Sequence, residues 1–199
     1  MLIEPHLEGS GRESRRSGWI EVICGSMFSG KTEELIRRLN RAVIAGQKVE
    51  IFKPAIEKRY HDKNVVSHND RSIRSTPVQF ADDVVLLAGE SQVVGIDEAQ
   101  FFDSEIVNVS IALANKGKRV ILAGLDMDFM GKPFGSMPQL MAVAEFVTKI
   151  HAICMNCGDV ASYSYRTSLG KEKIMLGEKE TYEARCRKCF WEAMGNDKK

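Results

Sequence analysis

The stretch "WIEVICGSMFSGKT", residues 19–32, decides the fold of this chain. Its first part, Trp19–Cys24, is apolar and rich in β-branched residues, which predicts a buried strand. The second part, residues 25–32, matches the whole G-x-x-x-x-G-K-[S/T] pattern of a phosphate-binding loop, and a helical pattern follows it. A strand, a glycine-rich loop and a helix in this order predict an α/β nucleotide-binding domain.

The phosphate-binding loop predicts how a nucleotide is held. Consecutive backbone N–H groups and the positive end of the following helix surround phosphate oxygens in such loops. We expect Lys31 to reach the outer phosphates and Thr32 to offer its hydroxyl to Mg²⁺. The residues predicted to bind ATP with Mg²⁺ are therefore those of the loop itself: Gly25, Ser26, Met27, Phe28, Ser29, Gly30, Lys31 and Thr32.

Short β-branched runs alternate with helical patterns as far as residue 150, which is typical of a mostly parallel sheet. Strands are expected at residues 19–24, 48–53, 92–97, 119–125 and 145–153, and helices at 31–46 and 103–117. In the first helix, the pairs Glu33 with Arg37 and Glu34 with Arg38 predict a solvated face. Residues 54–77 are mostly polar and without a clear period, so we expect a long loop there that is either functional or mobile.

Two adjacent carboxylates end the apolar run "VVGID" and continue into "EAQFF". A phosphate-binding loop that uses Mg²⁺ needs an acidic residue at the end of a neighbouring strand, and Asp97 fits this role. Glu98 then has the position of a general base that takes a proton from the group attacking the γ-phosphate. If that group is water, the protein is an ATPase. If it is an alcohol on a bound small molecule, the protein is a kinase.

Four of the five cysteines form two CxxC pairs, with 28 residues between the pairs. This pattern favours a closed tetrahedral site for a structural Zn²⁺. The predicted metal ligands are Cys154, Cys157, Cys186 and Cys189. Cys24 has no partner in the pattern, so we expect a buried apolar residue there.

Charge and hydrophobicity limit the kinds of binding partner that we expect for this protein. The 199 residues carry a formal net charge of +1, which gives no general electrostatic reason to bind nucleic acid or an acidic membrane. No apolar run approaches the roughly 20 residues of a spanning helix. Reduced cysteines and the absence of a signal-like N-terminus favour a cytoplasmic protein. An ATP-driven nucleic-acid protein with a zinc ribbon and a non-catalytic nucleotide-binding regulator remain alternatives.

Several segments together resemble the type II thymidine kinase family. They are "GSMFSGKTEELIRR", "KPAIEKRY", "IDEAQFF", "GLDMDFMGKPFG" and the two CxxC pairs, in this order. The resemblance implies a RecA-like P-loop domain with a small zinc-ribbon-like lasso domain. It also implies ATP and thymidine as substrates, feedback inhibition by dTTP, and a homotetramer that supplies DNA precursors by nucleotide salvage.

The resemblance also assigns site residues. Glu98, Lys31 and Arg166 correspond to catalytic positions, and Asp97 and Arg59 to positions that bind the nucleotide or its metal. A further set corresponds to nucleoside contacts: Met27, Phe101, Leu125, Phe129, Phe134, Ser164 and Tyr182. Without the resemblance, the phenylalanines would be interpreted as core residues.

These inferences divide the chain into four segments. Residues 1–18 are expected to be a flexible tail, and residues 19–150 the P-loop α/β domain. Residues 151–192 are expected to form the zinc-binding lasso domain, and residues 193–199 a C-terminal tail.

Overall fold

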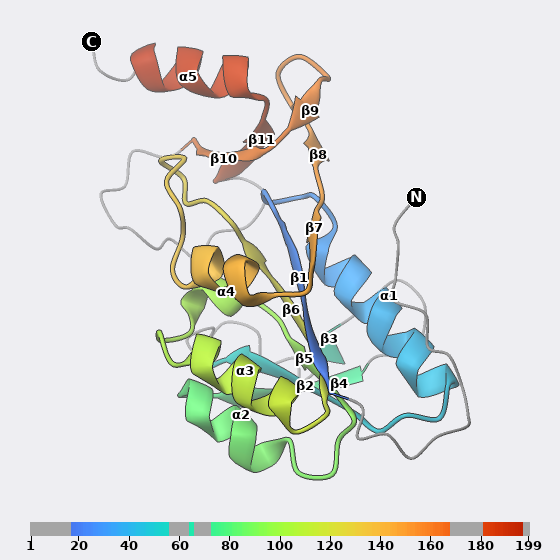
Figure 1. Cartoon of the computed structure of the whole chain (residues 1–199). Coiled ribbons are helices and arrows are strands. Elements are labelled where there is room, and N and C mark those ends of the chain that lie inside the picture. The colour runs from blue at the N-terminus through green and yellow to red at the C-terminus, as the bar shows by residue number, and fades with distance from the viewer. Residues whose placement is uncertain (1–16, 56–63, 66–72, 168–180, 197–199) are drawn as a thin grey trace.

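The computed structural model describes residues 17–55, 64–65, 73–167 and 181–196. A seven-stranded sheet with the order β3-β4-β2-β5-β6-β1-β7 lies at its centre (Figure 1). Every neighbouring pair is parallel except β3 with β4 at one edge. The strands are β1 Trp19–Gly25, β2 Val49–Pro54, β3 Asn64–Val65, β4 Ile73–Val78, β5 Val93–Ile96, β6 Arg119–Leu125 and β7 Phe146–Lys149. The mostly parallel α/β sheet confirms the predicted fold class.

Helices cover both faces of the sheet (Figure 1). Helix α1 packs on one face, where its Leu35 and Leu39 join Ile23, Ile51 and Ile121 in a buried cluster. The opposite face carries a larger apolar cluster under the other three helices. The helix bounds are α1 Lys31–Ile44, α2 Ala81–Leu87, α3 Ile106–Asn115 and α4 Met137–Val143. Burial on both faces explains the nearly continuous apolar runs of the central strands.

The parallel register brings the functional segments to one edge of the sheet. Gly25 at the end of β1 lies opposite Leu125 at the end of β6, and β5 between β2 and β6 ends at Ile96, immediately before Asp97. Since ligands of open parallel sheets bind outside the carboxyl ends of the strands, this edge is where the site is expected.

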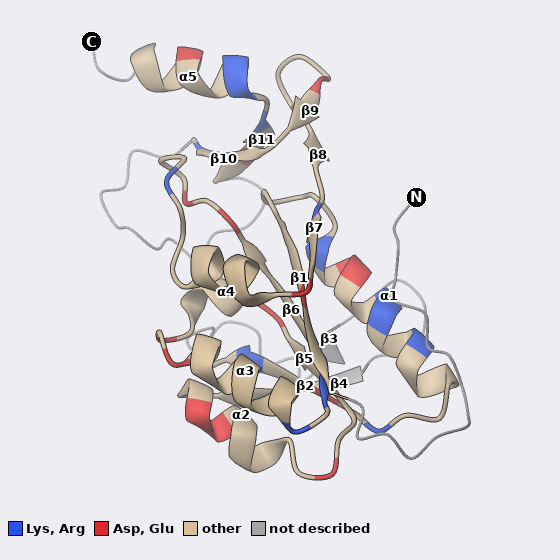
Figure 2. Ribbon diagram, in the orientation of Figure 1, with Lys and Arg blue, Asp and Glu red and all other residues tan. Residues whose placement is uncertain are grey.

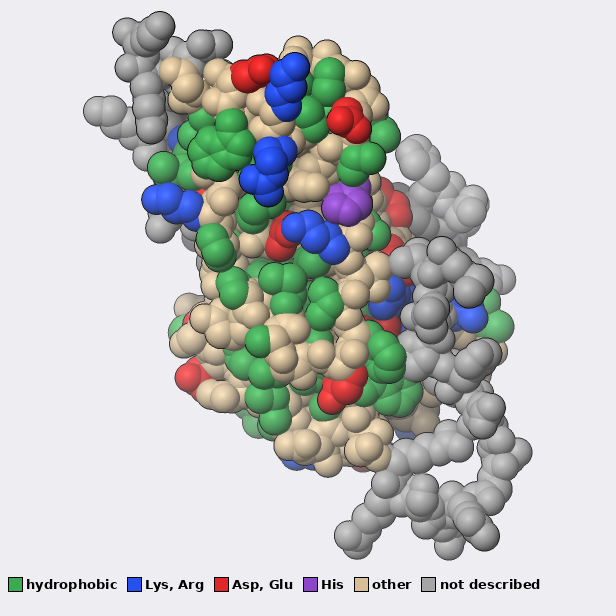
Figure 3. All heavy atoms as spheres, turned by 45° about the horizontal axis from the view of Figure 1, so that its top comes forward, with side chains coloured by type: hydrophobic (Ala, Val, Ile, Leu, Met, Phe, Trp, Pro, Cys, Tyr) green, Lys and Arg blue, Asp and Glu red, His purple; other side chains and the backbone are tan. Residues whose placement is uncertain are grey.

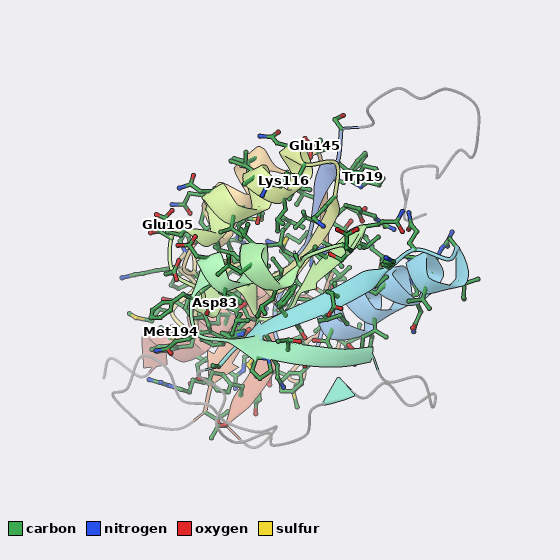
Figure 4. The ribbon with its side chains drawn as sticks, turned by 90° about the horizontal axis from the view of Figure 1, so that it is seen from below. Trp19, Asp83, Glu105, Lys116, Glu145 and Met194 are labelled. Carbon is green, nitrogen blue, oxygen red and sulfur yellow. The ribbon has the colours of Figure 1, made fainter. Side chains whose placement is uncertain are left out.

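The opposite end of β1 is fixed by a side chain. The Ile20 backbone N–H donates to the Glu145 carboxylate over 2.7 Å, and Figure 4 labels Trp19 and Glu145 at this end of the sheet. This bond joins the start of β1 to the segment that leads into β7.

The strand predicted at residues 145–153 is two strands in the structure. β7 ends at Lys149, and Ala152–Ile153 form β8 in a separate sheet. Between them, the Ile150 N–H donates to the Cys24 carbonyl over 2.9 Å. A Cβ on Gly25 would lie only 2.1 Å from the Ile150 carbonyl oxygen, so the chain passes close to the phosphate loop as it leaves the sheet.

The unbroken loop predicted at residues 54–77 is also wrong in part. β4 occupies Ile73–Val78 and pairs with β2 on one side and β3 on the other. β4 lies near the edge of the sheet, and Val78 is the residue of this strand that joins the large apolar cluster. Its sequence "IRSTPV" therefore shows no apolar alternation from which a strand could be predicted. The helices α2 and α4 were not predicted, since their seven residues each are too short to show a helical period.

A small cysteine module, residues 151–196 as far as the structure describes them, follows β7 and lies beyond the carboxyl ends of the strands (Figure 1). It contains two antiparallel pairs, β8 with β9 and β10 with β11, followed by a helix. The new bounds are β9 Val160–Ala161, β10 Tyr163–Arg166, β11 Tyr182–Arg185 and α5 Arg187–Asn196. Helix α5 extends into the segment expected to be a C-terminal tail.

Glu34 and Arg38 do not lie on a solvated face, contrary to the prediction. Arg38 is only 2% exposed and donates to both Glu34 and the fully buried Glu21. Glu21 also accepts hydrogen bonds from Arg119 and Trp19. Burial alone would raise the pKa of Glu21, but the hydrogen bonds and charge of Arg119, with Trp19 and Arg38, hold it below its usual range.

We expect Glu21→Gln to lower the free energy of unfolding by about 3–5 kcal/mol, because it leaves the buried Arg119 without its carboxylate partner and the buried Arg38 with Glu34 alone. Urea denaturation at pH 7 measures the change. The same substitution at the exposed Glu33 of α1 is the control and should change stability by no more than about 0.5 kcal/mol. Equal effects at the two positions would contradict a stabilising role for the buried network.

Candidate active site

The phosphate loop connects β1 to α1 in a conformation that its glycines permit. Gly30 immediately before α1 has φ 85°, in the left-handed region. Phe28 at φ 63° is a non-glycine residue in the same region. The Ser29 hydroxyl and the Lys31 ammonium both donate to the Ser26 carbonyl, each over 2.8 Å. The predicted loop therefore forms a compact turn at the N-terminus of a helix, which is a site for anions.

Lys31 lies among carboxylates as well as beside the loop. Burial lowers the pKa of Lys31, whereas the negative charges of Glu98, Asp97 and Asp126 oppose that shift. These three acidic residues follow the ends of β5 and β6. The structure thus brings the predicted phosphate-binding cation and the predicted carboxylates to one edge of the sheet.

Thr32 and Asp97 form the pair expected of a Mg²⁺ site. The Thr32 hydroxyl donates to Asp97 Oδ2 over 3.1 Å. Burial, followed by the charge of Glu98, raises the pKa of Asp97 to about 7, and a divalent cation beside it would favour the ionised form. A hydroxyl and a carboxylate are hard oxygen ligands, so these residues fit Mg²⁺.

Glu98 stands on a strained piece of backbone. Its φ of 52° places a non-glycine residue in the left-handed region, just before a short 3₁₀ turn, Ala99–Phe101. Such conformations cost on the order of 1–3 kcal/mol and cluster at functional sites. The Gln100 amide donates to Glu98 Oε2 over 2.5 Å. The structure therefore holds this carboxylate in a specific place beside the phosphate loop.

The predicted nucleoside contacts meet in pairs. The rings of Phe101 and Phe134 pack edge to face at 5.5 Å, and the Arg166 guanidinium lies 3.8 Å above the Phe129 ring. All three phenylalanines are half-buried, unlike the fully buried Phe52 of the core. These rings are therefore only partly buried, and their assignment to the nucleoside pocket stays a prediction.

The cysteine module contacts the phosphate loop directly. The Ser164 hydroxyl on β10 accepts a hydrogen bond from the Met27 backbone N–H over 2.9 Å. Tyr182 on β11 is buried and lies opposite Arg166 in the ladder. Arg59, predicted to bind the nucleotide, lies outside the described residues.

Two features of this edge were not predicted. Gln100 connects Glu98 to β6, because its side-chain oxygen accepts the Leu125 N–H over 3.0 Å. Asp126, buried after β6, pairs with Lys149 at the end of β7 over 2.6 Å. The rule that sites form at the carboxyl ends of parallel strands points to Asp126 from sequence, whereas no sequence pattern reveals the contact of Gln100.

The four predicted cysteines form one cluster, which confirms that grouping. Their sulfur atoms all lie within 4.8 Å of one another, and Cys157 Sγ is 3.7 Å from Cys186 Sγ. In a tetrahedral zinc site with bonds of about 2.3 Å, sulfurs are about 3.8 Å apart. Burial raises the pKa of Cys154, but backbone N–H groups of Cys186, Asn156 and Cys157 outweigh it and lower the pKa to about 6. The cluster fits Zn²⁺.

Cys24 is fully buried in the core below the larger helical layer, as predicted. Burial, with the charge of Asp126, raises its pKa to about 11. None of the described helices is long and apolar enough to cross a membrane.

Comparison of the sequence with known proteins identifies the family to which this chain belongs. The family model described as thymidine kinase matches residues 18–190. A thymidine kinase of Bacteroides thetaiotaomicron is 57% identical over 197 residues, covering 99% of this chain and 97% of the relative. A thymidine kinase of Rhodothermus sp. is 60% identical over 173 residues, covering 87% of this chain and 81% of the relative. One from Porphyromonas gingivalis is 56% identical over 184 residues, with 92% and 90% covered. The chain therefore belongs to the thymidine kinase family.

Proposed function

We propose that this protein transfers the γ-phosphoryl group of ATP to the 5′-hydroxyl of thymidine and forms dTMP, a step in nucleotide salvage for DNA synthesis. The observation that carries the proposal is the meeting of Lys31, the Thr32–Asp97 pair and Glu98 at one edge of the sheet in a chain of this family. A site that only binds nucleotide gives no reason for a strained carboxylate beside the phosphate loop.

The roles follow from charge and position. Lys31 and the loop N–H groups bind and neutralise the phosphates, and Arg166, with Arg59, adds positive charge as the group transfers. Mg²⁺, when bound through Thr32 and Asp97, neutralises phosphate charge. Glu98 takes the proton of the attacking hydroxyl.

The nucleoside is proposed to lie against the half-buried rings. The apolar side of this nucleoside pocket is formed by Phe101, Phe129, Phe134 and Leu125. The pocket is closed by Met27 from the phosphate loop and by Ser164 and Tyr182 from the cysteine module. The Ser164–Met27 hydrogen bond supports this arrangement, because it joins the cysteine module to the phosphate loop. The enclosure would exclude water that otherwise competes for the γ-phosphoryl group.

We expect Phe101→Ala to raise the KM for thymidine by roughly 10-fold and leave the KM for ATP nearly unchanged, because it removes one ring of the packed Phe101–Phe134 pair. Steady-state kinetics with each substrate varied in turn measure the split. Phe80→Ala is the control, since Phe80 is 56% exposed and lies immediately before α2. An unchanged KM for thymidine would remove Phe101 from the pocket.

The cysteine cluster is proposed to hold one structural Zn²⁺ through Cys154, Cys157, Cys186 and Cys189. Four cysteine ligands fill a tetrahedral site and leave no open position, so the ion stabilises the module and takes no part in phosphoryl transfer. We assign residues 19–150 to the P-loop domain and 151–192 to the lasso domain. A homotetrameric, cytoplasmic enzyme that dTTP inhibits is the further proposal that family membership supports.

The distribution of surface charges gives little support to the alternative of an ATP-driven nucleic-acid protein. Lys and Arg alternate with Asp and Glu over the described parts of both the sheet domain and the cysteine module (Figure 2). The face in Figure 3 likewise mixes both signs with hydrophobic side chains. Nucleic-acid binding calls for a clustered basic surface, so we favour small-molecule substrates.

One assay tests the proposed function. The protein is incubated with ATP, Mg²⁺ and separate nucleosides, and the monophosphate formed from each is measured. Thymidine should be phosphorylated far faster than purine nucleosides and ribonucleosides. Failure to form dTMP, or ATP hydrolysis that depends on DNA and on no nucleoside, would overturn the proposal.

A further inference from the structure

Gln100 is a buried amide that the proposed reaction does not yet use. Its side chain belongs to a residue only 3% exposed, within the turn that follows Glu98. The side-chain oxygen accepts the Leu125 N–H over 3.0 Å, and the side-chain nitrogen donates to Glu98 Oε2 over 2.5 Å. Both ends of the amide are therefore engaged, one by β6 and one by the candidate general base.

The orientation of this amide is dictated by its surroundings. The Leu125 backbone N–H is always a donor, so only the Gln100 oxygen is able to face it. The amide NH₂ group must then point to Glu98, where it donates to a carboxylate oxygen. A hydrogen bond to a charged acceptor is stronger than a neutral one. The contact with β6 therefore fixes which group of Gln100 meets Glu98.

Two glycines leave the space that Gln100 occupies. A Cβ on Gly124 would lie 2.7 Å from the Gln100 side-chain oxygen. A Cβ on Gly135 would lie 2.3 Å from the Gln100 backbone oxygen, and Gly135 has φ +51°, which disfavours other residues. Gln100 is thus held at its backbone and at its side chain by segments far from it in sequence.

We propose that Gln100 is a positioning residue that holds the Glu98 carboxylate for phosphoryl transfer. This inference rests on the proposed role of Glu98. Gln100 engages Oε2, so Oε1 is the oxygen left to take the proton of the acceptor hydroxyl. The Glu98 side chain has rotatable bonds through which its carboxylate would reorient if this hydrogen bond were removed, and a misplacement near 1 Å at a reacting group costs about 10²-fold in rate.

A purely structural role makes a different prediction. In that case Gln100 would serve only as the acceptor for the Leu125 N–H, and its loss would lower stability without a specific effect on catalysis. A double-mutant cycle separates the two roles, because a residue that acts through Glu98 has no partner to act on once Glu98 is replaced.

The experiment compares wild type, Gln100→Met, Glu98→Gln and the double variant in the full chain with Zn²⁺, with ATP and thymidine varied separately. We expect Gln100→Met to lower kcat by roughly 10- to 100-fold and to change either KM by less than about 3-fold. In the Glu98→Gln background, the same substitution should change kcat by less than about 2-fold. Gln100→Asn retains an amide but is one methylene shorter, so it cannot reach both partners and should show the same pattern if Gln100→Met does not fold.

Gln92→Met is the matched control. The Gln92 side-chain oxygen also accepts a backbone N–H, from Lys48 over 3.1 Å, but at the opposite end of β5. Its kcat should equal that of wild type. A kcat of Gln100→Met and Gln100→Asn near wild type, or an effect that persists in full without Glu98, would overturn the inference. If wild type itself forms no dTMP, the proposed function fails instead.

Discussion

Glu98→Gln is expected to lower kcat by roughly 10²- to 10⁴-fold, which is the range that a general base contributes. The substitution keeps the shape of the side chain and removes its ability to take a proton. The phosphate loop and the Thr32–Asp97 pair are unchanged, so ATP should bind nearly as in wild type. Steady-state assays give kcat, and calorimetric titration with ATP gives the affinity.

Glu105→Gln controls for the same chemical change elsewhere. Glu105 is exposed immediately before α3, and its carboxylate accepts a hydrogen bond from the Asn108 side chain of that helix over 3.0 Å. Its kcat should match that of wild type. A kcat for Glu98→Gln within about 3-fold of wild type would show that another group accepts the proton.

Removal of zinc should abolish phosphoryl transfer while the phosphate loop still binds ATP. One buried cluster of the module consists of three cysteines and three alanines, and all three cysteines are predicted metal ligands, so we expect the module to loosen when the metal is removed. Ser164, Arg166 and Tyr182 lie on this module, so its unfolding would remove the hydrogen bond from Met27 of the phosphate loop to Ser164 and displace the other two residues. We expect about one zinc per chain by elemental analysis, and chelation should increase hydrogen exchange across β8–β11.

Two cysteine substitutions sharpen that test. Cys186→Ser should lower zinc content and activity together, because it removes one of the four ligands. Cys24→Ala is the control, since Cys24 lies in the core of the main sheet and should leave zinc content at one per chain. Zinc-free protein with full activity would contradict the structural role of the metal.

Local patterns account for what could be predicted from the sequence. The phosphate loop, the carboxylates at Asp97 and Glu98, and the paired cysteines each depend on spacing within a short segment. The parallel sheet follows from apolar runs such as "VILAGL" in β6. Cys157 and Cys186 are far apart in the sequence, and their proximity could be predicted only because a shared metal ion requires its ligands to lie together.

Contacts between distant segments explain what could not be predicted. Glu34 and Arg38 have the spacing of a surface pair, but Glu21 from β1 turns them into a buried network. In the sequence, Gln100 is one polar residue in a turn. Its role depends on the Leu125 N–H of β6, which fixes the orientation of its side-chain amide and lies far from it in the sequence. Asp126 and Lys149 meet because β6 and β7 both flank β1, a fact of sheet order that no short segment contains.

The destination of the γ-phosphoryl group tests the central proposal most directly. ATP labelled at the γ-phosphate is incubated with the protein, Mg²⁺ and thymidine, and label in dTMP is compared with label in inorganic phosphate. We expect nearly one labelled dTMP for each ADP formed, and little ADP when thymidine is absent. Label that accumulates as inorganic phosphate at the same rate with or without thymidine would contradict the proposal.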